Sequence, residues 1–110
     1  MVNDILALAG FVKNETFRAV RFTKPPKSTY AVYHDSVERG GGDTVALYKR
    51  HSITIEIYSY SPDPDCEARI EAQLDAFYPL MIDGWSKQNA YWIEEEKLYQ
   101  VIYEFEYFEK

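Results

Sequence analysis

The chain has 110 residues and a net charge of −6, and a chain of this length has room for one domain, residues 1–110. Its single cysteine, Cys66, excludes an intramolecular disulfide, and no apolar stretch approaches the roughly 20 residues that a membrane-spanning helix needs. The first residues lack the pattern of a secretory signal, so we expect a protein that is made and used in a cytoplasm, away from membranes.

Aromatic residues and an uneven distribution of charge are the unusual features of the composition. There are ten Tyr, six Phe and two Trp, and Tyr is enriched at protein interfaces because it buries a ring and keeps a polar tip. Residues 1–50 carry eight Lys or Arg against five Asp or Glu, whereas residues 51–110 carry four against thirteen. This asymmetry fits head-to-tail self-association of a basic surface with an acidic one, and also fits an ordinary solvated surface. The acidic part of the chain would repel nucleic acid.

The first part of the chain predicts a helix, two strands and a loop. In residues 3–13 the apolar side chains follow helical spacing, with Asn3 in the position of an N-cap. Residues 16–23 fit a short strand, and the paired prolines after them impose an extended link. Residues 29–35 predict a second strand, and the glycine-rich segment 38–43 predicts a flexible connection.

The centre of the chain predicts the longest strand and the main helix. In residues 45–60, β-branched side chains alternate strictly, which is typical of a half-buried central strand. Asp63 fits an N-cap with a proline directly after it. In residues 65–82, apolar side chains form one continuous face that we expect to lie on the sheet, and Asp83 with Gly84 is expected to end the helix. The other side of this helix is acidic and is expected to be solvated: Glu67, Glu71 and Asp75.

The last part of the chain predicts a β-hairpin. Residues 90–94 and 98–108 alternate between aromatic or apolar and polar side chains, and the turn 95–97 joins them. Taken with the preceding elements, this predicts an α+β fold: a single, largely antiparallel β-sheet with an N-terminal helix and a second helix packed on it, closed by the C-terminal hairpin.

Candidate chemistry is sparse. Cys66 lies at the start of the predicted helix, where a thiol can be activated, but it has no His or Asn partner in a recognisable motif. The only two histidines, His34 (next to Asp35) and His51, lie on different predicted strands and are able to converge, although nothing in their spacing requires a metal site. The glycine-rich segment lacks the Lys and Ser or Thr of a phosphate-binding loop. We therefore expect no enzymatic activity, no metal and no cofactor.

Three segments, taken in order, resemble those of a known family. They are YAVYHD at 30–35 before a Gly-Asp loop, ITIEIY at 53–58 before the acidic helix, and EEEKLYQV at 94–101 with YEF at 103–105 near the C-terminus. Over about residues 25–110, this set resembles the small tail-completion or head–tail joining proteins of long-tailed bacteriophages and prophages, the tail-terminator type.

The resemblance implies a small, non-enzymatic α+β protein that assembles as a ring, usually of six copies, on the end of a tail tube. Such a ring stops tube growth and meets the head connector, so the implied partners are further copies of this chain, the tail tube protein and the head connector protein. DNA would pass through the ring without being specifically bound. The protein would act in the host bacterial cytoplasm during assembly and then in the tail of the virion.

From charge and flexibility, we expect nine residues at contacts with other copies or partners. They are Arg18, Arg21, Lys24, Arg39, Asp43, Lys49, Arg50, Glu67 and Glu71. Two alternatives remain open. One is a monomeric or dimeric regulatory module that holds a peptide along an open sheet edge. The other is an enzyme that uses Cys66 or the His34–Asp35 pair.

Overall fold

This computed structural model describes residues 1–41 and 46–109. They contain two α-helices, one short 3-10 helix and five strands, joined by turns and loops. In chain order they are α1 (Val2–Leu8), β1 (Phe17–Ala19), β2 (Tyr30–Gly41), β3 (Ala46–Ser59), α2 (Pro64–Phe77), η1 (Tyr78–Leu80), β4 (Ile82–Ile93) and β5 (Leu98–Glu109). None of the helices in these residues is long and apolar enough to cross a membrane.

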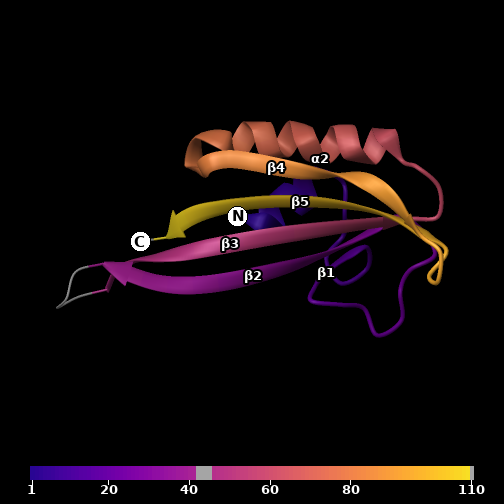
Figure 1. The fold of residues 1–110 in the computed structure, drawn as a ribbon, viewed down its shortest axis with the longest axis horizontal. Coiled ribbons are helices and arrows are strands. Elements are labelled where there is room, and N and C mark those ends of the chain that lie inside the picture. The colour runs from indigo at the N-terminus through magenta and orange to yellow at the C-terminus, as the bar shows by residue number, and fades with distance from the viewer. Residues whose placement is uncertain (42–45, 110) are drawn as a thin grey trace.

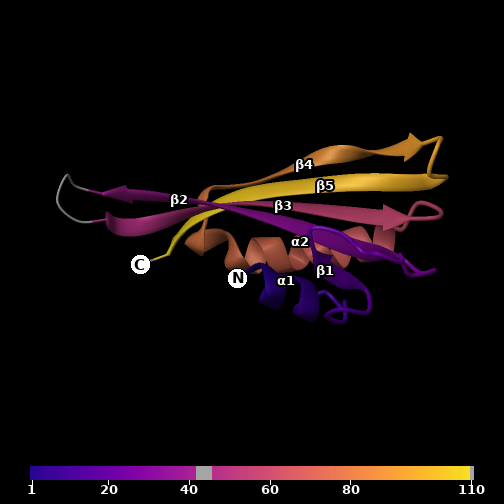
Figure 2. The same cartoon turned by 90° about the horizontal axis from the view of Figure 1, so that it is seen from below.

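The five strands form one sheet in the order β1-β2-β3-β5-β4. Only the short β1 pairs in parallel with its neighbour, and the other three pairings are antiparallel. Both α-helices lie on the same face of this sheet (Figure 2), and none of the described residues forms a helix on the other face. The predicted α+β fold, with its largely antiparallel sheet, two helices and C-terminal hairpin, is therefore confirmed.

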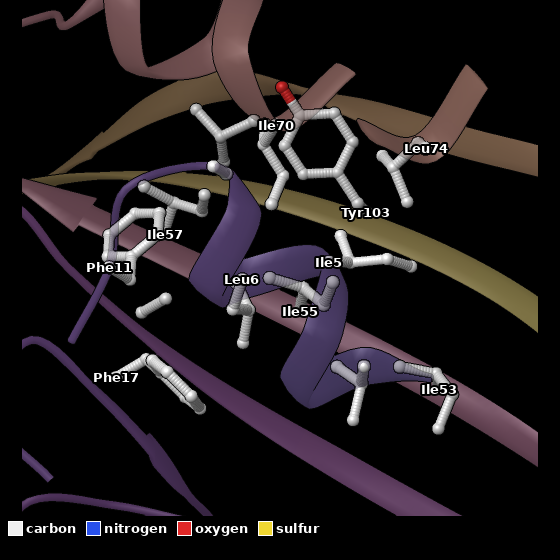
Figure 3. Close-up of a cluster of buried hydrophobic side chains, with 14 of the residues drawn as sticks. Ile5, Leu6, Phe11, Phe17, Ile53, Ile55, Ile57, Ile70, Leu74 and Tyr103 are labelled. Carbon is white, nitrogen blue, oxygen red and sulfur yellow. The ribbon is translucent and has the colours of Figure 1, made fainter. Parts of the chain in front are cut away.

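The core lies between the helices and the central strands. Ile53, Ile55 and Ile57 of β3 point towards the helices and are at most 2% exposed, as their strict alternation predicts. They meet Ile70 and Leu74 of α2, which are fully buried (Figure 3). Burying a side chain of this size stabilises the fold by roughly 1.5–3 kcal/mol, so this layer holds the sheet and helices together.

Helix α2 begins as predicted and ends earlier than predicted. The carboxylate of Asp63 accepts a hydrogen bond from the backbone N–H of Cys66 at 3.1 Å, which confirms the N-cap. The helix then runs only to Phe77 instead of residue 82, because Pro79 has no N–H to continue the helical hydrogen bonds and the chain tightens into η1.

The N-terminal helix is also shorter than the predicted segment 3–13. Met1 takes the N-cap position without a side-chain hydrogen bond, and Asn3 lies inside the first turn, so the predicted Asn3 cap is wrong. Gly10 has a φ of 104°, a conformation that glycine adopts readily, and the helix ends before it. Ile5 and Leu6 are fully buried, which fixes this short helix on the sheet.

Strands β1 and β2 differ from their predicted lengths in opposite directions. Strand β1 covers only Phe17–Ala19 of the predicted 16–23, because Val20 has a φ of 67° and turns the chain away. Strand β2 continues past the predicted end at residue 35 as far as Gly41, into the segment 38–43 where a flexible connection was expected, since β3 pairs with it over this length. Residues 42 and 43 of that segment lie outside the described residues. The β2–β3 hairpin therefore extends past the helices (Figure 1), and we call residues 36–41 and 46–52 the arm. The molecule measures 50 × 28 × 23 Å.

Strand β4 begins at Ile82, eight residues before the predicted strand 90–94. Asp83 and Gly84, expected to end the helix, instead form an irregularity in the pairing of β4 with β5. Both have positive φ, 58° and 73°, so they bulge out of the ladder. Because β4 starts irregularly and continues with polar residues, its side chains do not alternate in the way that predicts a strand.

Replacing Gly84 by Ala is expected to lower the free energy of unfolding by about 1–2 kcal/mol, because an Ala side chain is unfavourable at a φ of 73°. An added Cβ would also lie 2.5 Å from Cε2 of Tyr78, so that ring must move. Urea unfolding measures the loss. In a Tyr78→Ala background the steric contribution to this loss disappears and the contribution from the backbone conformation remains. If Gly84→Ala left the free energy of unfolding unchanged in both backgrounds, the prediction would be contradicted.

Candidate functional site

A basic edge runs along β1 and the segment after it. Phe17 is buried in the core and anchors β1, whereas its neighbour Arg18 is exposed. After the turn at Val20, Arg21 and Lys24 are exposed as well. Within residues 1–41 and 46–109, none of these three cations forms an ion pair. We call Arg18, Arg21 and Lys24 the basic edge, and their charges are available for an acidic partner.

The arm carries three more of the expected contact residues. Arg39 and Lys49 stand directly opposite each other on β2 and β3, and like charges in this position destabilise a sheet. Arg50 instead has a partner: its guanidinium donates to both carboxylate oxygens of Glu106, at 2.9 and 3.0 Å, and holds the pKa of Glu106 below its usual value. Asp43 lies outside the described residues.

Glu67 and Glu71 of α2 contact a lysine of β4. The Nζ atom of Lys87 lies 2.8 Å from a carboxylate oxygen of each residue. Burial acts to raise the pKa of Glu71, but hydrogen bonds from Lys87 and the Tyr103 hydroxyl outweigh it and lower this pKa. The expectation of a solvated acidic face is therefore wrong for Glu67 and Glu71. This expectation failed because Lys87 was not expected in a strand beside the helix.

The side of the sheet opposite the basic edge is acidic. Asp83 of β4 and Glu104 of β5 are exposed there, and we call these two residues the acidic edge. Glu96, in the turn between these strands, lies instead near the basic edge, because it lines one pocket together with Arg21. On the helix-free face beside it, a shallow groove of about 390 Å³ is polar along much of its length. Its polar lining residues are Ser52, Thr54, Asp83, Ser86, Glu104 and Glu106.

The aromatic side chains are divided between core and surface. Tyr103 is completely buried and Tyr30 nearly so. The ring of Tyr48 on the arm meets the ring of Phe108 on β5 edge to face, with centroids 4.7 Å apart, and both are exposed. Other exposed rings lie on several elements: Tyr60, Tyr78, Tyr91 and Trp92. The expectation that aromatic surface contacts another protein stays a prediction.

The two histidines do not converge. His34 and Asp35 are neighbours on β2 and so point to opposite faces of the sheet. His34 lies 3.6 Å from Glu56, whereas Asp35 contacts His51 on the helix side of the sheet. In the described part of the chain, no three His, Cys, Asp or Glu side chains are arranged to hold a metal ion.

Cys66 is buried in the core at the start of α2. Burial is the main cause that raises the pKa of its thiol to about 11, and the nearby carboxylate of Asp63 acts in the same direction. Very little reactive thiolate is present at neutral pH as a result. The helix N-terminus is a position where a thiol can be activated, but burial outweighs that effect here.

The fold and these surfaces define a small α+β protein with a basic and an acidic edge on opposite sides of one sheet. No protein-family model matches the chain, and no curated protein matches it. Among solved structures, it is similar to a chain in the virion of a native gene transfer agent particle, with a TM-score of 0.59 and 16% sequence identity over 94% of this chain and 82% of that chain. At this identity the likeness shows that the fold is shared.

Proposed function

We propose that the protein is a structural protein of a bacteriophage or prophage, of the tail-terminator or head–tail joining type, which forms a ring on the end of the tail tube. The observation that carries the proposal is the separation of charge across the sheet: the basic edge lies at β1 and the acidic edge at β4 and β5. Figure 1 shows these strands on opposite sides of the sheet. The fold shared with a chain of a virion particle supports it.

Opposite edges of opposite charge suit a head-to-tail contact between copies. In such a contact the basic edge of one copy meets the acidic edge of the next, and the series closes into a ring if the rotation divides evenly. Complementary charge speeds this encounter and disfavours a contact between two like edges. Six copies in the assembled ring, as the resemblance implies, is the stoichiometry that we propose.

The helix-free face fits the passage of DNA without specific binding. Among the described residues of this face, Arg50 pairs with Glu106, and His34 lies 3.6 Å from Glu56. Glu104 adds negative charge along the groove, whereas the charge of Glu106 is balanced by Arg50. An acidic surface repels phosphate and lets a duplex slide past. We propose that the other partners are the tail tube protein and the head connector protein, first in the host bacterial cytoplasm and then in the virion tail.

Native mass spectrometry of the full chain tests the proposal, over a wide protein concentration range and with and without purified tail tubes. A closed ring, alone or only on tubes, is the expected result. A monomer or dimer that is indifferent to tubes would overturn it. Tubes with capped ends and tubes with free ends separate end binding from binding along the tube wall, because only free ends should recruit the protein.

One observation favours a second candidate function, a monomeric or dimeric module that binds a peptide. Beyond Tyr33, the outer side of β2 has no strand partner within the described residues, because β1 pairs only as far as Tyr33. An extended peptide is able to add to such an edge. A small fixed oligomer with a saturable peptide site would favour this candidate over the ring.

A further inference from the structure

An ionic cluster with a buried centre and partly exposed carboxylates lies at the base of the arm, on the side of the sheet that the helices occupy. His51 of β3 is 8% exposed and stands between two carboxylates from the neighbouring strands. Its Nδ1 atom lies 2.8 and 3.0 Å from the two carboxylate oxygens of Asp35 on β2. Its Nε2 atom lies 2.6 Å from a carboxylate oxygen of Glu109 on β5. The imidazole also stacks on Tyr107, with ring centroids 4.6 Å apart and planes 7° apart.

This geometry specifies the protonation state of the imidazole. A carboxylate offers only acceptor oxygens, so each ring nitrogen of His51 must donate a proton to its partner. A neutral imidazole has one N–H and one nitrogen lone pair. It therefore donates a hydrogen bond to one carboxylate, and its lone pair repels the other. Only the imidazolium satisfies Asp35 and Glu109 together.

We propose that Asp35, His51 and Glu109 form a protonation-controlled latch that holds the end of β5 against β2 and β3. Strand β4 pairs with β5 only between Glu106 and Leu98, so residues 107–109 have β3 as their one strand partner in the described chain. The latch links this exposed strand end to β2, two strands away. It also sets Phe108 on the opposite face, where its ring contacts Tyr48.

The charged and titratable groups around His51 come from each element packed there. Asp35 faces it from β2, and Glu109 and the Tyr107 ring face it from β5. The hydrogen bond from His51 is the main cause that holds the pKa of Glu109 below its usual value, and the charges of Lys49 on β3 and of the chain N-terminus act in the same direction. Glu109 therefore stays ionised over the range in which His51 titrates.

The direction of the pH dependence follows from these contacts. Burial alone would lower the pKa of His51, but the hydrogen bonds and charges of Glu109 and Asp35 outweigh burial and raise this pKa above its ordinary value. A group with a raised pKa in the folded state contributes its full stability below its unfolded value, about 6.5 for His. The latch is therefore closed in mildly acidic solution and opens as the pH rises through the folded pKa of His51.

Imidazole ¹H–¹⁵N NMR spectra of the full-length chain between pH 5 and 9 test the latch, with His34→Ala used to assign the two histidines. We expect His51 to titrate above pH 6.5, and the backbone amides of residues 107–109 to shift with the same midpoint. Glu109→Gln removes one charged acceptor and should lower the midpoint by about one unit or more. His51→Gln should abolish the pH dependence of these amides.

Glu106→Gln is the matched control. It removes the same charge from the same strand, but Glu106 pairs with Arg50 on the opposite face of the sheet, so the His51 midpoint should shift much less than in Glu109→Gln. A His51 midpoint at or below 6.5 would overturn the proposal. The proposal would also be overturned if the backbone amides of residues 107–109 did not shift with the His51 midpoint. Equal shifts of that midpoint in Glu109→Gln and Glu106→Gln would overturn it as well. None of these results depends on ring formation, so the latch and the proposed function are tested separately.

Discussion

Reversing the charge of Arg18 and Arg21 together, by Arg18→Glu and Arg21→Glu, is expected to abolish ring formation and leave the fold intact. Both side chains are exposed and have no ion-pair partner among the described residues, so their loss removes no internal contact of that kind. If the basic edge meets the acidic edge of the next copy, reversal places like charges together at a cost on the order of several kcal/mol per contact. Each 1.4 kcal/mol is tenfold in affinity, so the apparent dissociation constant should rise by about 100-fold or more.

Native mass spectrometry measures this effect, and thermal unfolding checks that the variant is folded. Arg18→Lys with Arg21→Lys keeps the charge and should still form rings. A third variant tests the pairing of edges directly: adding Glu104→Lys to the reversed protein restores opposite charge and should recover part of the assembly. Rings that form equally well in the reversed protein would show that the basic edge is not the contact. Rising salt should weaken assembly of the unaltered protein, because exposed charges are screened.

The elements that the sequence predicts well are those with a strong local pattern. Strand β3 was predicted within one residue at each end, because Ile53, Ile55 and Ile57 alternate along a strand that is buried on one face. Helix α2 was located from its cap at Asp63 and its apolar face. In both cases a residue's neighbours in the chain determine its environment, so that periodicity is sufficient.

The elements that were predicted poorly depend on partners far away in the chain. The first half of β4 is polar and starts with a bulge, and it is a strand because β5 pairs with it. Since this half was missed, Lys87 was not placed beside α2, and the acidic face of that helix was wrongly expected to be solvated. The arm of β2 was taken for a loop for the same reason, because its glycines hide a strand that β3 stabilises.

The same difference between local patterns and distant partners applies to the candidate site. The basic edge was found because its charges are close together in the sequence. The cluster around His51 was not found, since Asp35 and Glu109 lie 16 and 58 residues away from it. No spacing rule joins such residues: only the strand order β2-β3-β5 brings them together. Composition indicated an acidic and a basic surface, and the topology is what places them on opposite sides of the sheet.

Replacing Tyr103 by Ala is expected to destabilise the protein by about 3–5 kcal/mol, the range for deleting a large buried ring. Tyr103 is completely buried on β5, close to Ile70 and Leu74 of α2 (Figure 3). The ring of Trp85 stands edge on to it at 5.9 Å. Deleting the ring opens a cavity between sheet and helix, and a loss of this size is a large part of the total stability of a small domain. Urea unfolding at constant pH measures it.

Tyr103→Phe separates the ring from its hydroxyl. The hydroxyl donates to a carboxylate oxygen of Glu71 at 2.7 Å, and its burial with that acceptor raises the pKa of Tyr103. Glu71 keeps its contact with Lys87 in this variant, so no carboxylate is left without a donor and the cost should be about 1 kcal/mol. If Tyr103→Phe were as damaging as Tyr103→Ala, the hydrogen bond would be the main contribution and packing the smaller one. The smaller effect expected for Phe follows because the apolar ring, not the hydroxyl, fills the space between the sheet and α2.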